Sequence, residues 1–312
     1  MKDESHSPAI SRAHLTLPLV GAGGEPIDFR RTICSHGLVD LAPHEPAPDY
    51  RSLTTTLAID TGARTIRLWE LQRGTLAVDV LGRTPSAAAR ADMLRQVRIM
   101  FALDDNLSNF YAQIADDSSL SWAARGGGRL LRSPSAFEDV VKTILTTNCA
   151  WSATIRMNRA LVSNLGAPSA GDATRRAFPG AEAMAEASLD FYRDVVRAGY
   201  RGSYLRALAQ AVTTGELDLE ALRKTKRSEL SDEALEKRLR ALPGVGPYAA
   251  AHIMLLFGRR HQLVLDSATR PKYARLSGRK AKDATIVRRF ARYGDEAGLA
   301  FWLFLTRDWI ED

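Results

Sequence analysis

The segment that most restricts how this chain can fold is 242–248 (LPGVGPY), which lies between two stretches of helical periodicity. Gly244 and Gly246 flank Val245, and glycine adopts positive φ without steric penalty. The chain can therefore reverse tightly here, with Val245 inserted between the two helices. The second helix would begin with free backbone N–H groups and the positive end of its dipole, an arrangement that suits a phosphate. The pattern predicts a hairpin of two helices over 231–258.

The rest of the sequence divides into a strand-rich part and a helix-rich part. Alternating apolar residues at 65–71 and 76–81 predict a β-hairpin, preceded by a strand at 54–59. Farther along, nearly every segment has helical periodicity. We therefore predict an α+β fold with three parts: a disordered tail at 1–12, an antiparallel sheet domain at 13–85 and a helical domain at 86–312. The expected helices are 87–102, 137–148, 151–165, 181–198 and 203–213, and the expected loops are 41–49 and 165–176.

The charge and cysteine content restrict the partners and the compartment. The net charge is +7, and residues 237–292 hold 14 Lys and Arg against two acids, Asp266 and Asp283. Such a block is typical of a surface that binds a polyanion, although a solvated basic face has the same composition. Two cysteines are too few for an iron–sulfur cluster, a zinc ribbon or a disulfide framework. No long apolar run or signal peptide is present, so we expect a cytoplasmic protein with no membrane partner.

The hairpin and the residues after it resemble the helix-hairpin-helix DNA glycosylases of base excision repair. In that superfamily a Gly/Pro-rich hairpin is followed about 20 residues later by a catalytic aspartate, and here Asp266 stands 20 positions after Gly246. Residues 135–149 and 198–204 are similar to the subgroup that contains 3-methyladenine glycosylase II and 8-oxoguanine glycosylases. The resemblance covers residues 27–310. It implies a monomer that binds double-stranded DNA with a damaged base, that is nucleoid-associated when bound, and that needs no redox or organic cofactor.

The resemblance assigns the chemistry to Asp266. Breaking an N-glycosidic bond builds positive charge on the deoxyribose, and a carboxylate beside the sugar stabilises that charge and orients or deprotonates a water. The alternative for Asp266 is a helix cap, and the two roles are compatible. Family members that also cleave the strand have a lysine two residues after the last hairpin glycine, where this chain has Tyr248. Tyrosine cannot form a Schiff base, so we expect a monofunctional hydrolase with water as nucleophile.

The remaining candidate residues follow from their positions within the same resemblance. For the base pocket, or for the wedge that fills the gap left by a flipped base, they are Asn148, Cys149, Trp151, Tyr248 and Lys142. Contact with DNA phosphate is assigned to Gly244, Val245, Gly246, Tyr248 and Arg270, and a K⁺ or Na⁺ site to the carbonyls of Leu242 and Val245.

Structural alternatives stand beside several of these assignments. Asn148 has the alternative of a helix C-cap, Trp151 of a core residue, and Lys142 of a surface or phosphate-contacting residue. Tyr200 and His252 are expected to serve the core. His36, by the same resemblance, falls in the part of the sheet domain that touches the damaged base.

Two other functions fit part of these observations. A non-enzymatic hairpin module would bind DNA, but it has no use for a carboxylate near phosphates, where it lowers affinity. A bifunctional glycosylase/lyase would need another amine, such as Lys142 or Lys272. For the substrate, the missing lysine favours an alkylated purine, whereas the segments 146–148 and 199–201 favour 8-oxoguanine, and a bulky or crosslinked lesion is a further alternative. We predict release of an alkylated purine to leave an abasic site.

Overall fold

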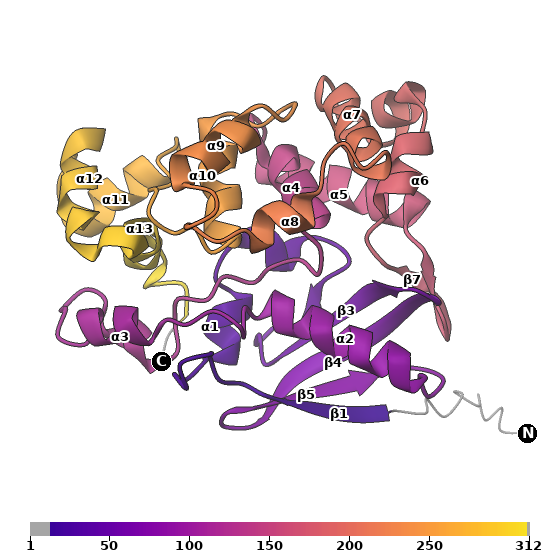
Figure 1. Cartoon of the computed structure of the whole chain (residues 1–312), viewed down its shortest axis with the longest axis horizontal. Helices are drawn as coiled ribbons and strands as arrows, with labels where there is room; N and C mark the ends of the chain where they lie inside the picture. The colour runs from indigo at the N-terminus through magenta and orange to yellow at the C-terminus, as the bar shows by residue number, and fades with distance from the viewer. Residues whose placement is uncertain (1–12, 311–312) are drawn as a thin grey trace, which may run out of the picture.

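The computed structural model of the protein describes residues 13–310, so the tail expected at 1–12 lies outside the described residues. The strands gather on one side of the molecule and most of the helices on the other, with α2 (Ala87–Met100) lying along the sheet (Figure 1). This is the predicted α+β arrangement, in which a sheet near the N-terminus is followed by a helical body. None of the described helices is both long enough and apolar enough to cross a membrane.

The sheet is antiparallel in its main part and follows the alternation of the sequence. Its path runs β1-β5-β4-β3-β2, so that β4 lies in the middle and β1 at one edge. The turn between β4 and β5 contains Gly74 at φ 80°, and the predicted hairpin is confirmed. The strands are β1 (Ala13–Pro18), β2 (Glu45–Pro46), β3 (Ser52–Ile59), β4 (Gly62–Gln72), β5 (Thr75–Val80), β6 (Pro168–Ser169) and β7 (Asp172–Arg176).

Several helices begin at a residue whose hydroxyl or carboxylate caps the first turn. The Ser135 side chain accepts a hydrogen bond from Glu138 N, and Ser231 accepts one from Ala234 N. Helix α1 (Phe29–Ile33) lies between β1 and β2. After α2 the helices of the body are α3 (Ser108–Ile114), α4 (Ala136–Thr146), α5 (Trp151–Leu165), α6 (Ala181–Glu186), α7 (Arg201–Thr213), α8 (Leu219–Lys224), α9 (Asp232–Arg240), α10 (Pro247–Leu256), α11 (Thr269–Ser277), α12 (Asp283–Phe290) and α13 (Ala297–Thr306).

Two hydrophobic cores hold these layers together. One core lies between the sheet and α2, and it includes Leu68, Val78, Met93 and Val97. The other fills the helical body, where every side chain from Ala249 to Leu256 is buried. Because α10 is apolar on all sides, other helices surround it. Helix α2 thus packs with the sheet, although it follows residue 85, where the predicted sheet domain ends.

The predicted helical hairpin is formed by α9 and α10. Leu235 and Leu239 on α9 are fully buried, and Val245 is 5% exposed at the turn. Gly244 has φ 81°, and a Cβ atom there would lie 3.0 Å from the ring of Tyr204. A larger residue at this position would therefore be strained and crowded. Pro247 occupies the first position of α10, where its missing N–H costs nothing.

Two segments differ from the sequence prediction. The expected loop at 165–176 contains β6 and β7, because β6 pairs with the middle strand β4 and the Thr65 hydroxyl donates a hydrogen bond to Ser169 Oγ at 2.9 Å. The expected helix at 181–198 is broken after α6, and a π-helical turn follows at Phe191–Val195. Arg197 and Gly199 then adopt positive φ, 55° and 59°, so the chain cannot continue as one helix into α7.

Candidate active site

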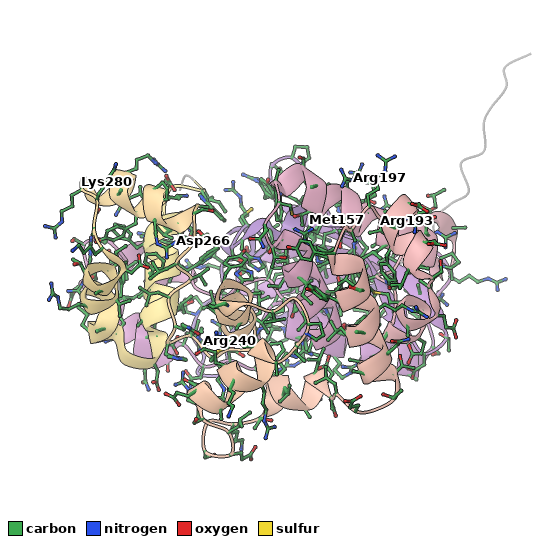
Figure 2. All side chains as sticks on the ribbon, turned by 90° about the horizontal axis from the view of Figure 1, so that it is seen from above. Met157, Arg193, Arg197, Arg240, Asp266 and Lys280 are labelled. Atoms are coloured by element: carbon green, nitrogen blue, oxygen red, sulfur yellow. The ribbon has the colours of Figure 1, made fainter. Side chains whose placement is uncertain are left out.

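A cleft of about 1180 Å³ opens where the α9–α10 hairpin meets the ends of α4, α5 and α7. It contains Asp266, the hairpin turn and four of the five predicted pocket or wedge residues. Asp266 and Arg240, which both line it, lie on the same side of the molecule in the view from above (Figure 2). The lining residues are 146–149, 151, 154, 200, 204, 240, 242, 244–249 and 265–268.

Asp266 is half-buried and held in a tight turn just before α11. Its Oδ1 atom accepts hydrogen bonds from the backbone N–H groups of Ala268 and Thr269, at 2.8 and 2.6 Å. The Thr269 hydroxyl accepts the Asp266 N–H at 2.8 Å. Within residues 13–310, Oδ2 makes no hydrogen bond. The carboxylate thus holds the first turn of α11 with one oxygen, and its other oxygen has no partner among the described residues, while the catalytic role stays a prediction.

Tyr248 stands at the start of α10, where it lines the cleft together with Asp266 and contacts a buried aromatic group. Its ring stacks on His252 at 6.2 Å between centroids, and His252 meets His36 and Trp302 edge to face at 5.6 and 5.9 Å. Burial raises the pKa of the Tyr248 hydroxyl, so this group is protonated at neutral pH. Burial also lowers the pKa of His252 to about 4, and His252 is therefore neutral.

The sequence made different predictions for the two buried histidines, His252 and His36. His252 is 6% exposed and lies in the core, as expected. The Nε2–H group of His36 donates to the Leu131 carbonyl at 2.6 Å, and the Nδ1 atoms of both histidines lack a hydrogen-bond partner within residues 13–310. His36 lies behind the stack formed by Tyr248 and His252 rather than on the cleft surface.

The hairpin turn presents its backbone to the cleft. The Leu242 carbonyl accepts the Val245 N–H at 3.1 Å, and the Gly246 carbonyl accepts the Ala250 N–H at 2.9 Å. A carbonyl has two lone pairs, so the one on Leu242 retains capacity for a cation, and the K⁺ or Na⁺ site stays a prediction. No group of three or more acidic, histidine or cysteine residues in the described chain could hold a metal.

The wedge candidate Asn148 occupies a strained turn at the end of α4. Its φ is 48°, a conformation that asparagine tolerates better than most residues. Arg201 fixes this turn through two hydrogen bonds to Thr147. Its Nη2 donates to the Thr147 carbonyl, and its Nε donates to Thr147 Oγ1 at 3.3 Å. Arg201 is 6% exposed. The Asn148 side chain is thereby presented to the cleft by a fixed backbone.

Tyr200 and Tyr204 belong to the cleft, which the sequence did not predict. Tyr200 was expected in the core, but it is 51% exposed, and that prediction is wrong. Its hydroxyl accepts a hydrogen bond from the Asn148 amide at 3.2 Å, and its ring meets that of Tyr204 at 5.7 Å. Tyr204 in turn contacts Gly244 of the hairpin. The spacing of four residues on one helix was the available signal, since it puts both rings on one face.

Trp151 and Cys149 lie at the other side of the same turn. Trp151 is 38% exposed, so the alternative of a core position is excluded. Its indole rests on the backbone of Gly37, where a Cβ atom would lie 2.7 Å from the ring. Cys149 Sγ contacts the Leu145 carbonyl at 3.2 Å and Thr154 Oγ1 at 3.4 Å, and both Cys149 and Trp151 line the cleft.

Two predicted residues are not brought to the cleft. Lys142 is fully buried and pairs with Glu138 one helical turn away, at 2.6 Å, so both the pocket position and the surface position predicted for it are wrong. Arg270 is exposed on α11 and pairs with Asp283 at 2.8 Å, outside the cleft lining. Lys272 pairs with Asp308 at 3.1 Å. No lysine among residues 13–310 lines the cleft.

Comparison with solved structures finds the same fold in known DNA-processing proteins. The 3-methyladenine DNA glycosylase of Archaeoglobus fulgidus superposes with a TM-score of 0.73 at 18% identity, over 95% of this chain and 100% of that one. The 8-oxoguanine glycosylase/lyase of Clostridium acetobutylicum, without DNA, gives 0.68 at 15% identity, over 95% and 98% of the two chains. MBOgg1 in complex with a low-affinity DNA ligand gives 0.69 at 19% identity, over 96% and 99%.

These likenesses are structural, because no family model and no curated protein matches the sequence. They extend over nearly the whole of each chain, so both the sheet and the helical body are shared. The predicted fold, an N-terminal antiparallel sheet followed by a larger helical body that contains the helix-hairpin-helix, is confirmed.

Proposed function

We propose that this chain, which has the fold of helix-hairpin-helix DNA glycosylases, is a monofunctional DNA N-glycosylase that releases an alkylated purine and leaves an abasic site. The observation that carries the proposal is the placement of Asp266. One of its oxygens is tied to the backbone of α11, and the other is available in the same cleft as the hairpin turn. A pure DNA-binding surface gains nothing from a carboxylate held there, since phosphates repel it.

The chemistry follows from the position of this carboxylate. As the N-glycosidic bond breaks, positive charge grows on the deoxyribose while the bonding electrons leave with the base. Asp266 stabilises that charge and orients a water, which attacks the sugar carbon and gives a proton to the carboxylate as the hydrolysis is completed. Because its Oδ1 is fixed by two N–H donors, the group is preorganised and does not have to reorient during the reaction.

Hydrolysis by water, rather than attack by an amine, is supported by the absence of a lysine. Tyr248 occupies the position where a lyase needs its lysine, and its hydroxyl is protonated. Lys142 is buried in the core, where its ammonium forms an ion pair with Glu138. The described residues therefore offer the cleft no amine for a Schiff base.

Duplex DNA with an extruded base is the substrate that the cleft suits. The hairpin N–H groups and the start of α10 bind a phosphate of the damaged strand. Asn148, held at φ 48° by its surroundings, fills the gap in the stack once the nucleotide has left it. Unstacking costs a few kcal/mol, and a rigid wedge recovers part of that cost.

An alkylated purine is favoured by the electron-rich lining of the cleft. Trp151, Tyr200, Tyr204 and Tyr248 supply aromatic rings, and Arg240 is the one basic side chain among the described lining residues. Rings and a carboxylate attract a base that carries positive charge, as an N-alkylated purine does. Such a base is also a good leaving group and needs little acid assistance.

The test is release of free base from duplex oligonucleotides that carry an alkylated purine, 8-oxoguanine, hypoxanthine or uracil. Asp266→Asn is the main variant, because asparagine Oδ1 can accept the same two N–H bonds and so preserves the turn. Asp283→Asn is its matched control, an acid of the same basic stretch that is bound to Arg270 outside the cleft.

We expect base release from the alkylated duplex, strand breaks only after alkali, and a loss of about 10²–10³-fold in Asp266→Asn but not in Asp283→Asn. Strand breaks without alkali, with borohydride trapping, would contradict the monofunctional assignment. Binding without release from any lesion would leave a non-enzymatic DNA-binding module.

A further inference from the structure

Arg197 adopts a backbone conformation that is unfavourable for arginine. Its φ is 55°, in the left-handed region where a Cβ atom crowds the backbone. The flanking residues Val196 and Ala198 are fully buried, and the Ala198 N–H donates to the Tyr192 carbonyl at 3.0 Å. The turn is therefore fixed by its neighbours, while the Arg197 side chain is exposed. A glycine would meet the backbone requirement without strain.

The guanidinium of Arg197 has no role within the described protein. It makes no hydrogen bond or ion pair with any residue from 13 to 310. Its neighbour Arg193, by contrast, is paired with Asp190 at 2.7 Å and Asp194 at 2.8 Å. The two arginines lie together on one side of the view from above, and Asp266 and Arg240 lie toward the other side (Figure 2). An unpaired cation at a strained position indicates a partner outside the chain.

The turn that carries Arg197 leads directly into the cleft. Three residues later comes Tyr200, which lines the cleft and contacts Asn148. From there contacts run through Tyr204 to Gly244 of the hairpin. A duplex that lies along this row meets backbone N–H donors at the hairpin and a cation at the opposite end. Its phosphates are the ligands that suit both ends.

We propose that Arg197 is held in its left-handed conformation to contact a backbone phosphate of duplex DNA, as a second anchor at the end of the cleft away from the hairpin. The inference rests on the proposed function for the identity of the partner. It does not involve base release, because a phosphate contact positions the duplex and takes no part in the chemistry. Arginine also suits a phosphate through its planar set of donors.

Binding of an undamaged duplex, followed by fluorescence anisotropy from 50 to 300 mM KCl, tests the proposal. Arg197→Gly removes the charge and the strain together, Arg197→Lys keeps the charge, and Arg90→Gln on α2 is the control for loss of one exposed positive charge far from the cleft. Loss of one phosphate contact lowers the slope of log K against log salt by about 0.9. We expect that change in Arg197→Gly, with binding about five- to tenfold weaker near 0.1 M salt.

The thermal midpoint of Arg197→Gly is expected to equal or exceed that of the parent protein, because the strain is gone. Arg197→Lys and Arg90→Gln should keep the parental slope. A parental slope in Arg197→Gly, an equal loss in Arg90→Gln, or no salt-dependent duplex binding by the parent protein would overturn the proposal. Undamaged duplex is not cleaved, so a failure of base release in the Asp266 experiment leaves this result standing, and the two proposals fail separately.

Discussion

The buried pair of Lys142 and Glu138 makes a prediction that separates stability from catalysis. The two side chains lie one turn apart on α4, 2.6 Å from each other, and are 0% and 6% exposed. The Lys142 ammonium also lies 5.5 Å from the centre of the Phe178 ring. Replacing Lys142 by Met, Glu138 by Met, or both removes the charges singly and together while keeping side chains of similar volume.

The magnitude follows from the distance and the burial. At 2.6 Å and an effective dielectric constant of about 20, the attraction is about 6 kcal/mol. Desolvation of the two ions costs several kcal/mol each, so the pair contributes little net stability. Removing one partner leaves the other ion desolvated and uncompensated, and we expect Lys142→Met to lose about 3–5 kcal/mol. The double variant should lie within about 1 kcal/mol of the parent protein.

Urea unfolding at pH 7, monitored by tryptophan fluorescence, measures this cycle. The double variant is then assayed for base release. We expect the parental rate, because neither residue lines the cleft.

Additive effects, with a coupling energy below about 0.5 kcal/mol, would show that the two charges do not depend on each other. A double variant that is stable but no longer releases base would refute the structural role, and it would restore Lys142 as a candidate amine.

The other predictions concern the strained turn and the buried histidines. Asn148→Gly should keep the stability of the parent protein, because φ 48° suits glycine, but it should slow base release about tenfold. Asn148→Ala should slow base release by a similar factor and, in addition, lower the free energy of thermal unfolding by about 1 kcal/mol. Burial lowers the pKa of His36 to about 3, of His252 to about 4 and of His44 well below 6.5, so each should remove about 1.4 kcal/mol of stability per pH unit as the pH falls below 6.5. Burial raises the pKa of Asp139 to about 6, so its protonation in the folded protein should offset the stability lost through one histidine between pH 6 and 4. His252→Gln should reduce the slope of the unfolding free energy against pH by about 1.4 kcal/mol per pH unit.

Features encoded by neighbouring residues were predictable from the sequence. The helical hairpin, the caps at Ser135 and Ser231, and the β4–β5 turn all depend on hydrogen bonds or φ preferences within a few positions. The separation between Gly246 and Asp266 is likewise a sequence property, and the structure places both in one cleft.

Features that depend on what covers a residue were not predictable. Lys142 and Glu138 have a spacing visible in the sequence, but an exposed pair and a buried pair look alike there. Tyr200 was assigned to the core and is exposed, because the chain breaks after α6 and turns at Arg197 before α7 begins.

The sequence by itself determined the local architecture, the hairpin and the one carboxylate on which the proposed chemistry depends. Only the tertiary structure decided that Trp151 rests on Gly37, that Arg201 holds the turn of Asn148, and that β6 joins the sheet. The reason is physical. Periodicity, caps and turns are set by interactions within about one helical turn, whereas burial and long-range contact arise only when distant segments pack and exclude water from the space between them.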